Sequence, residues 1–325
     1  MFWAQELSDD DARAFWSRSH SSPLFCNPEL LKFLGHQVAH FGAFKSDELV
    51  LVWPVMSGGK NRGTRPAFSY YFGPYMTQAL AEQRPFKAFR NFSESVNEIL
   101  GLISQSFDTL QVSVAPEFAD VRPFLWWNYG NASERQFRVD PRYSAKLDLS
   151  LFKNDESLLL SFRLDDKRKG IRKAVKGDRI LIQSGYEYDS DYLVSVYMQT
   201  LERSGGRILE EEVMSLRLLL SECAAEFSSE VRFKTLTAID RQTDSIVGFQ
   251  LLLMGNRDCY AIAQATTEEG RRLNANSLLT HASIQMARRL GLETFDFNGA
   301  NSPRRADDKH AFGASAAFYA DLELV

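Results

Sequence analysis

Apolar and polar positions follow one another in patterns that predict helices and strands along the whole chain. In the first half, two apolar runs separated by a short polar turn indicate a β-hairpin. An aromatic stretch follows, and then about twenty residues with apolar positions at helical spacing. The expected elements are, in order, helices at 10–19 and 28–35, strands at 36–44 and 48–56, an aromatic strand at 69–76 interrupted by Gly73 and Pro74, a helix from Arg84, a strand at 109–115, a short helix within 115–130 and an extended segment at 135–150.

The second half shows a similar order more clearly. Three strands separated only by short polar turns indicate an antiparallel meander. The expected elements are a helix at 155–176 with Gly177 as its C-cap, a strand at 179–184, helices at 191–205 and 210–227, strands at 231–240, 245–254 and 258–266, a polar loop at 267–276, a helix at 277–291 with Asn276 as its N-cap, and a strand at 292–299. A positively charged loop follows this last strand.

The length of the chain and the similarity of its halves predict two domains. A chain of 325 residues exceeds the usual size of one hydrophobic core. Both halves contain a hairpin, an aromatic strand, a helix and a strand in that order, which indicates two copies of one α/β (α+β) fold. We expect the domains at residues 1–150 and 151–325.

Composition limits the classes of function. Apolar residues make up 44% of the chain, charged residues 25%, and the net charge is −4, so no global field favours duplex DNA or an anionic membrane. No signal-peptide pattern and no run of about 18 apolar residues occurs, so we expect a cytoplasmic protein without a transmembrane segment. Cys26, Cys223 and Cys259 are far apart and lack histidines at ligand spacing, so neither a disulfide nor a metal site is expected.

The order of elements over residues 178–325 resembles the GCN5-related N-acetyltransferase (GNAT) fold. The segments RKGIRKAVKGDRI (168–180), LNANSLLTHASIQMARRLGLETFDFNG (273–299) and DKHAFG (308–313) resemble the FemAB-like branch of that superfamily, and SYYFGPY (69–75) fits its first domain. The resemblance implies two tandem GNAT-like domains, each with a mixed, mostly antiparallel sheet flanked by helices.

The resemblance also implies an activity. FemAB-like enzymes move an acyl group from an acyl-CoA, or an aminoacyl group from aminoacyl-tRNA, to an amine of a cell-envelope precursor or sugar. The donor is then a substrate rather than a tightly bound cofactor, the acceptor is a small or nucleotide-linked molecule, and tRNA is a partner only if it is the donor. Tyr75, Met76 and Thr77 replace the acidic residue that often follows Gly-Pro in the branch acting on peptidoglycan precursors, so the acceptor stays open.

A candidate site for the donor's phosphates precedes the helix at 277–291. Free N–H groups and the macrodipole at a helix N-terminus attract anions, and Arg271 and Arg272 add positive charge. GNAT enzymes that use acetyl-CoA have Arg/Gln-x-x-Gly-x-Gly/Ala here, whereas this chain has Arg271-x-x-Asn274-x-Asn276. We expect these four residues to bind donor phosphate. The alternative is an ordinary polar loop before a capped helix.

Residues around the last strand are candidates for catalysis. Asp296 alternates with Phe295 and Phe297, and a carboxylate on an inner strand must be paired or lie at a cleft. Asp296 could act as a general base or hold the acceptor amine, or it could pair structurally with an arginine. Asn298 is a candidate for acceptor binding, with turn formation as the alternative.

The segment that follows matches the Lys-x-x-Phe-Gly pattern of the FemAB-like branch. The resemblance implies that Lys309 stabilises negative charge on the donor or on the oxyanion, and that Arg304 and Arg305 assist in binding phosphate. The alternative is a surface loop whose charges partly cancel. His310 could serve as a base, although the pattern gives it no fixed role.

Acceptor-binding candidates come from two other segments. Arg172 and Lys173 lie in a basic stretch at 163–179 that the resemblance places beside the acceptor cleft, and Tyr70 and Tyr71 lie beside Gly73-Pro74. A solvated basic face and core packing are the respective alternatives. Two other functions stay open: a non-catalytic binding module on a transferase scaffold, and a nucleic-acid-binding regulator that uses the basic stretch.

Overall fold

The computed structural model describes residues 1–19, 23–118, 120–185, 187–207, 209–221 and 231–325. The chain forms two compact units, one of Met1–Tyr143 with Phe318–Val325 and one of Ser144–Ala317. The division thus lies a few residues before Ser150, and the last residues of the chain return to the first unit. Strand β7 (Phe137–Asp148) leads into the second unit and strand β13 (Ser315–Leu324) leads back.

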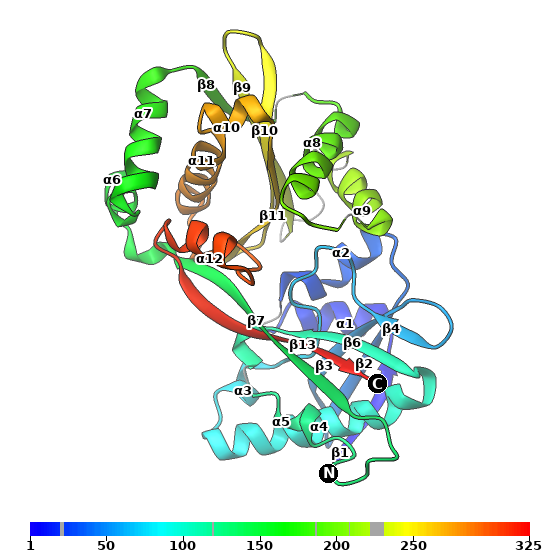
Figure 1. Ribbon diagram of the computed structural model, residues 1–325. Coiled ribbons are helices and arrows are strands. Elements are labelled where there is room, and N and C mark those ends of the chain that lie inside the picture. The colour runs from blue at the N-terminus through cyan, green and yellow to red at the C-terminus, as the bar shows by residue number, and fades with distance from the viewer. Residues whose placement is uncertain (20–22, 119, 186, 208, 222–230) are drawn as a thin grey trace. The chain divides into compact units, whose positions relative to one another are not determined.

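The first unit is a mostly antiparallel sheet with helices against it (Figure 1). Its strands run in the order β1-β2-β3-β4-β6-β13, with β5 paired to β3 and only β4 and β6 parallel. The strands are β1 (Phe2–Leu7), β2 (Val38–Lys45), β3 (Glu48–Ser57), β4 (Arg62–Thr64), β5 (Tyr75–Met76) and β6 (Thr109–Val114), and the helices are α1 (Asp9–Trp16), α2 (Pro28–Phe33), α3 (Gln78–Ala81), α4 (Pro85–Ser106) and α5 (Arg122–Leu125), with 3-10 turns at Leu24–Cys26 and Pro116–Phe118.

The predicted hairpin and long helix of the first half are confirmed. β2 and β3 pair antiparallel from Val38 opposite Met56, and α4 buries one apolar face that includes Val96 and Ile99, although Phe86 in its first turn is exposed. The aromatic strand expected at 69–76 is wrong: only β5 and an isolated bridge between Phe72 and Ser113 form. Gly73 lies so close to β6 that a Cβ there would stand 3.2 Å from the Ser113 carbonyl oxygen. Pro74, which follows Gly73, has no N–H to donate to a neighbouring strand, so a regular strand does not continue here.

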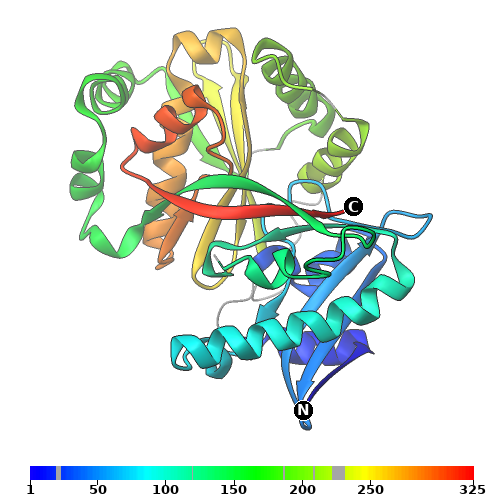
Figure 2. The ribbon, with the colours of Figure 1, turned by 60° about the horizontal axis from the view of Figure 1, so that its bottom comes forward.

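The second unit has a sheet of strand order β7-β12-β11-β10-β9-β8, in which only β11 and β12 are parallel. Helices lie on both sides of it, with α8 and α9 opposite α11 (Figure 2). The elements are a 3-10 turn (Leu149–Leu151), α6 (Asp155–Ser161), a π-turn (Leu164–Arg168), α7 (Lys169–Gly177), β8 (Ile180–Ser184), α8 (Ser190–Arg203), α9 (Glu210–Ser221), β9 (Arg232–Asp240), β10 (Ser245–Met254), β11 (Asp258–Thr266), α10 (Glu268–Arg272), α11 (Ala275–Arg289), β12 (Thr294–Asp296) and α12 (Pro303–His310).

The helix expected at 155–176 is interrupted, because Phe162 takes an extended backbone and packs in the core at 1% exposure. It contacts Phe312 edge to face at 5.1 Å. The burial of this ring separates α6 from the π-turn and α7. The expected strand at 292–299 is also shorter, since it ends at Asp296.

Two segments expected to be loops contain helices. α10 lies within 267–276, and α12 occupies the charged stretch after Gly299. α11 begins at Ala275, so its N-cap is Asn274 rather than Asn276. Asn274 has a left-handed backbone (φ 61°), a conformation that asparagine tolerates better than most residues. This turn joins α10 directly to α11.

The core of the second unit surrounds the strand that carries Asp296. Phe295 and Phe297, on either side of it, pack against each other at 4.9 Å, and Phe297 stacks on Phe312 at 5.8 Å. The buried cluster also includes residues of β7, β9, β10 and α11, among them Leu147, Leu236, Leu252, Leu279 and Ile284. These apolar contacts fix the polar groups described next.

Candidate functional site

The neighbouring strands β11 and β12 separate after three residue pairs. They are hydrogen-bonded in parallel from Asp258–Thr294 to Tyr260–Asp296, where β12 stops and β11 continues to Thr266. β11 also contains an extra residue, Ile262, at a bulge opposite β10. In the described part of the chain, no strand pairs with 262–266 on the side that β12 has left. An extended ligand with amide groups can add to such an edge.

Asn298 lies at the point where the strands separate. Its backbone is left-handed (φ 53°) and its side-chain Nδ2 donates to the carbonyl oxygen of Ala261 on β11 at 2.9 Å. The residue is 1% exposed, and its Oδ1 accepts no hydrogen bond from any residue that the structure describes. A buried acceptor without a donor costs free energy, so this oxygen is suited to a ligand N–H.

Asp296 is fully buried and satisfied within the protein. Its carboxylate accepts hydrogen bonds from the Ser144 hydroxyl and from the Asn298 backbone N–H at 2.8 Å, and Lys146 Nζ lies 3.8 Å away. Asp296 therefore links β12 to β7 and holds the turn at Asn298. Its 0% exposure favours the structural alternative, with a lysine rather than an arginine as the ionic partner.

Lys309 reaches the same turn from α12. Its ammonium donates to the backbone carbonyl oxygens of Phe297 and Gly299 at 2.8 Å each and to that of Asn298. Burial lowers its pKa to about 8, although Asp296 and Asp308 favour the charged form. Since an ammonium has three N–H donors, all of them are used here. The geometry favours Lys309 as a positioning residue for the turn.

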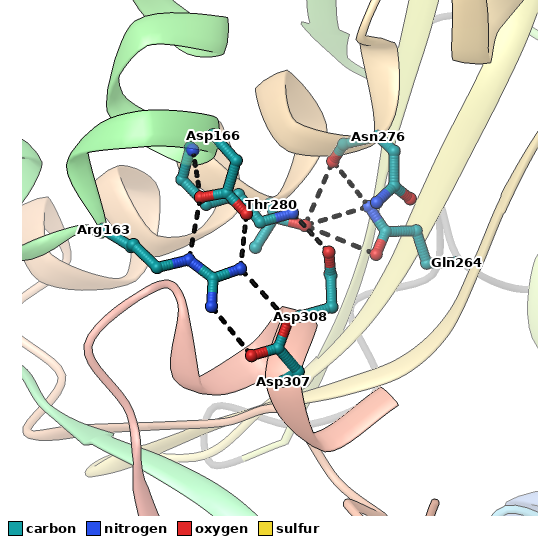
Figure 3. Close-up of polar contacts among 8 residues, drawn as sticks. Arg163, Asp166, Gln264, Asn276, Thr280, Asp307 and Asp308 are labelled. Atoms are coloured by element: carbon teal, nitrogen blue, oxygen red, sulfur yellow. Dashed lines mark hydrogen bonds and ion pairs between the residues drawn. The ribbon is translucent and has the colours of Figure 1, made fainter. Parts of the chain in front are cut away.

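α12 is held to the π-turn by ion pairs (Figure 3). The Arg163 guanidinium donates to Asp307 at 2.8 and 3.1 Å and also binds Asp166. The backbone N–H of Arg163 donates to the Ala311 carbonyl oxygen at 2.8 Å. Lys167 pairs with Asp308 and lies 4.9 Å from the centre of the Phe312 ring. The Arg163 guanidinium lowers the pKa of Asp166 to about 2. These contacts fix the helix that carries Lys309.

The first turn of α11 is attached to β11. Gln264 donates from Nε2 to the Asn276 carbonyl oxygen at 2.9 Å and exchanges hydrogen bonds with Thr280 (Figure 3). The Nδ2 of Asn274 is buried and has no partner among the described residues. Gly170 of α7 leaves room for this amide, because a Cβ there would lie 2.9 Å from Nδ2. The turn thus offers an unpaired donor beside a helix N-terminus.

The arginines predicted to bind phosphate differ in their availability. Arg272 pairs with Glu268 at 2.5 Å and lies 3.7 Å from Glu269. Arg271, Arg304 and Arg305 are exposed and make no ion pair within the described part of the chain. Only these three therefore keep a free guanidinium for an anion.

Most cations of the basic stretch at 163–179 are already paired. Arg172 lies 3.3 Å from Glu156, and Arg179 pairs with Asp240 at 2.8 Å. Lys173 is exposed and, as far as the structure describes the chain, has no ionic partner. Little free positive charge remains for nucleic acid.

Tyr70 and Tyr71 belong to the first unit. Tyr71 is 1% exposed and contacts Tyr319 edge to face at 5.4 Å, which is core packing. Tyr70 is half-buried, and its carbonyl oxygen accepts a hydrogen bond from Ser113 at 2.5 Å. This geometry favours the packing alternative for Tyr71 and leaves the acceptor role of Tyr70 a prediction.

The structure brings together Asp296, Asn298 and Lys309, and separately Arg271, Asn274 and Asn276 at the start of α11. The partners that organise the first group, Ser144 and Lys146, were missed. They lie two residues apart on β7 and so face the same way, a signal that the sequence did contain. Gln264, which joins the start of α11 to β11, left no such signal.

Other kinds of site find no support among the residues that the structure describes. No group of three or more His, Cys, Asp or Glu residues could hold a metal, and no helix is long and apolar enough to cross a membrane. Cys26 and Cys259 are buried and reduced, and burial raises the pKa of Cys26 to about 12. A thiol of that pKa is not a nucleophile at neutral pH. Cys223 lies outside the described residues.

Comparison with known proteins agrees with this topology. Residues 165–308 match the family described as "Acetyltransferase (GNAT) domain". No curated protein sequence matches the chain. Among solved structures, FemX is 12% identical with a TM-score of 0.63, covering 98% of this chain and 96% of its own.

Two further structures share the fold. A tandem GNAT protein from the clavulanic acid biosynthesis pathway is 11% identical with a TM-score of 0.56, covering 100% of this chain and 98% of its own. The C-terminal domain of a putative lysylphosphatidylglycerol synthetase from Agrobacterium fabrum is 11% identical with a TM-score of 0.52. The match covers 98% of this chain and 92% of that domain's chain. Residues 165–308 therefore form a GNAT acetyltransferase domain, and nearly the whole chain shares the fold of FemX and of the tandem GNAT protein.

Proposed function

We propose that this protein transfers an acyl or aminoacyl group from an activated, phosphate-bearing donor to an amine. The separation of β11 from β12 after Tyr260 carries this proposal, because β11 continues alone to Thr266 and then leads through α10 to the start of α11. Three features therefore lie beside β11. They are its own unpaired edge, the unpartnered Oδ1 of Asn298 and the N-terminus of α11. The GNAT domain at 165–308 contains all three features.

The donor would lie along β11 with its phosphates at the start of α11. The pantetheine arm of an acyl-CoA is extended and has two amides, so it can bond to the edge at 262–266. Arg271 and the Asn274 amide would contact phosphate, helped by the helix N-terminus. Asn276 would contribute through its side chain, which makes no hydrogen bond within the described chain. These features favour an acyl-CoA over an aminoacyl-tRNA, which would need more free positive charge.

The chemistry needs a neutral amine and a stabilised oxyanion. The amine attacks the acyl carbonyl, its extra proton passes to a base, and the thiolate or tRNA hydroxyl leaves. The Oδ1 of Asn298 can hold the attacking amine by accepting one of its hydrogens. His310 is the base that the geometry favours: its Nδ1 lies 2.7 Å from the Ala314 carbonyl oxygen, which can only accept, so Nε2 is the free acceptor nitrogen.

The acceptor is an amine of a small molecule, and we propose a cell-envelope precursor or an amino sugar. The FemAB-like fold supports the former, and structural similarity (TM-score 0.51, 10% identity) to a fungal glucosamine N-acetyltransferase region supports the latter. Arg304 and Arg305, both exposed and unpaired in the described chain, would meet a phosphate on either substrate. Because both donors are cytoplasmic metabolites, we place the reaction in the cytoplasm.

Thiol release from acetyl-CoA and longer acyl-CoAs, measured with a panel of amino sugars and envelope precursors, tests the proposal. Charged tRNA is the second donor to assay. Arg271→Glu should raise the KM for the donor at least tenfold, whereas Lys153→Glu, which reverses an exposed charge outside the site, should not. Failure of every donor to bind, in a thermal-shift measurement as well as in turnover, would contradict the proposal.

The full use of the Lys309 ammonium by backbone carbonyls favours a second candidate, a non-catalytic binding module. Such a protein would bind an acyl-CoA and be stabilised by it, but would release no thiol with any amine. The same assay therefore separates the two functions.

A further inference from the structure

A group of large apolar side chains that belongs to none of the candidate sites above is exposed on the first unit. Phe86 is 78% exposed, Tyr129 81%, Trp126 48% and Leu125 45%. With the half-buried Phe89 they form the α4–α5 aromatic patch. α5 lies along α4 near its first turns (Figure 1). Single exposed apolar residues are ordinary, but a contiguous group of this size marks an interaction surface.

Direct contacts join the α4 and α5 parts of the patch. Phe89 meets Trp126 edge to face at 5.6 Å. The guanidinium of Arg122 lies 4.2 Å from the centre of the Phe89 ring and 5.6 Å from that of Trp126, and Asp120 holds it by hydrogen bonds of 2.8 and 3.1 Å. Phe86 precedes Phe89 by three residues and so lies on the same face of α4.

The rim of the patch on α4 is positively charged. Arg84 and Lys87 are exposed and form no ion pair within the described residues. Arg90, one turn further on, pairs with Glu94 at 2.7 Å. The patch thus combines aromatic rings with unpaired cations beside them. Two of the rings, those of Trp126 and Tyr129, also have a polar N–H or O–H group.

We propose that the α4–α5 aromatic patch binds the surface of an anionic lipid bilayer. Tryptophan and tyrosine are suited to the level of the lipid headgroups because their rings are amphipathic, and Arg84 and Lys87 would meet lipid phosphates. The binding would be peripheral, since no described helix can span a membrane. The proposal goes beyond the proposed transfer reaction and does not depend on it.

The charge of the rim argues against a second copy of this chain as the occupant. A twofold interface would bury two identical patches in one contact, so the unpaired cations Arg84 and Lys87 of both copies would lie in the same interface without carboxylate partners. An excess of one charge in a shared interface opposes association. An anionic surface has the complementary charge.

Co-sedimentation of the full chain with vesicles tests the proposal. We expect binding to phosphatidylcholine vesicles with about 30% phosphatidylglycerol at least tenfold tighter than to pure phosphatidylcholine, and weaker in about 0.5 M NaCl because salt screens the charges. Phe86→Ser with Tyr129→Ser should lower the affinity at least tenfold, since both side chains are mostly exposed and their loss leaves the core intact. Arg84→Glu with Lys87→Glu should abolish the preference for anionic vesicles.

A matched control removes similar apolar exposure elsewhere. Leu151→Ser with Met214→Ser, at residues 71% and 61% exposed in the second unit, should bind vesicles like the unchanged protein. Thermal melting of each variant verifies folding. Absence of binding to anionic vesicles, or equal loss in the control variant, would overturn the proposal. A dimer in sedimentation velocity that Phe86→Ser with Tyr129→Ser dissociates would assign the patch to a second copy instead.

Discussion

The Nζ atom of Lys309, on α12, lies 2.8 Å from the carbonyl oxygen of Gly299, just beyond the end of β12. The same ammonium also binds the carbonyls of Phe297 and Asn298, so it holds together the turn that presents the free Oδ1 of Asn298. Three convergent carbonyls repel one another unless a cation lies between them. The position of Asn298 thus depends on a residue eleven positions further along the chain.

Lys309→Ala should lower turnover at least tenfold, because the loss of the cation lets the turn relax and displaces Asn298. Lys309→Arg, which keeps the charge, should retain more activity. Steady-state kinetics of the two variants provides the measurement, with melting curves to verify folding. Turnover in Lys309→Ala equal to that of the unchanged protein would remove Lys309 from the site.

The pH dependence of turnover should show the same residue. Because burial lowers the pKa of Lys309 to about 8, the ammonium is lost as the pH rises through that value, and activity should decline above it. Lys309→Arg should lack this decline, since a guanidinium stays protonated. Between about pH 8 and 10.5 the unfolded chain binds more protons at this lysine than the folded one, so its contribution to stability rises with pH. A fall in activity that Lys309→Arg does not alter would assign the pKa to another group.

Gly270→Ala should displace α10. A Cβ at Gly270 would lie 2.2 Å from the carbonyl oxygen of Val247, a backbone atom of β10 that also accepts from the Thr267 N–H at 2.9 Å. We expect a loss of roughly 1–3 kcal/mol in the free energy of unfolding and weaker donor binding, because α10 leads into the start of α11.

Gly101→Ala is the matched control for that prediction. Gly101 lies within α4, and a Cβ there meets nothing within 4 Å. Alanine favours a helix more than glycine does, so the free energy of unfolding should rise by up to about 1 kcal/mol. Chemical denaturation of both variants is the measurement. Equal stability of Gly270→Ala and the unchanged protein would show that α10 can move without cost.

His281 should make the protein sensitive to acid. It packs edge to face on Phe162 at 5.7 Å, and burial lowers its pKa below the ordinary 6.5, with Asp155 opposing and Arg289 adding to the shift. As the pH falls below about 6.5, the unfolded chain takes up this proton first, so stability falls. His281→Phe should flatten this decline in stability below about pH 6.5, measured by chemical denaturation at a series of pH values. Burial also lowers the pKa of His40 in the first unit. His40 is present in both proteins, so its effect on stability is the same in each.

The local pattern of apolar and polar residues determined most of the secondary structure. The hairpin of β2 and β3, the helix α4 and the meander of β9, β10 and β11 follow from periodicity alone, because each buries one face or is buried throughout. The order of these elements was enough to indicate two GNAT-like units. The residues of the candidate site could also be named, because polar groups next to a buried strand end are conspicuous in the sequence.

What these residues do was decided by contacts between distant positions. Asp296 is bound by Ser144, 152 residues earlier, and Arg163 by Asp307, 144 residues later. The break between α6 and α7 depends on burial of Phe162 against Phe312, and the charged stretch after Gly299 is a helix because ion pairs hold it to the π-turn. Local spacing carries no information on such pairs, since either partner alone has many ways to be satisfied. Only the packed fold selects among them, because it brings one particular partner within reach of each charge.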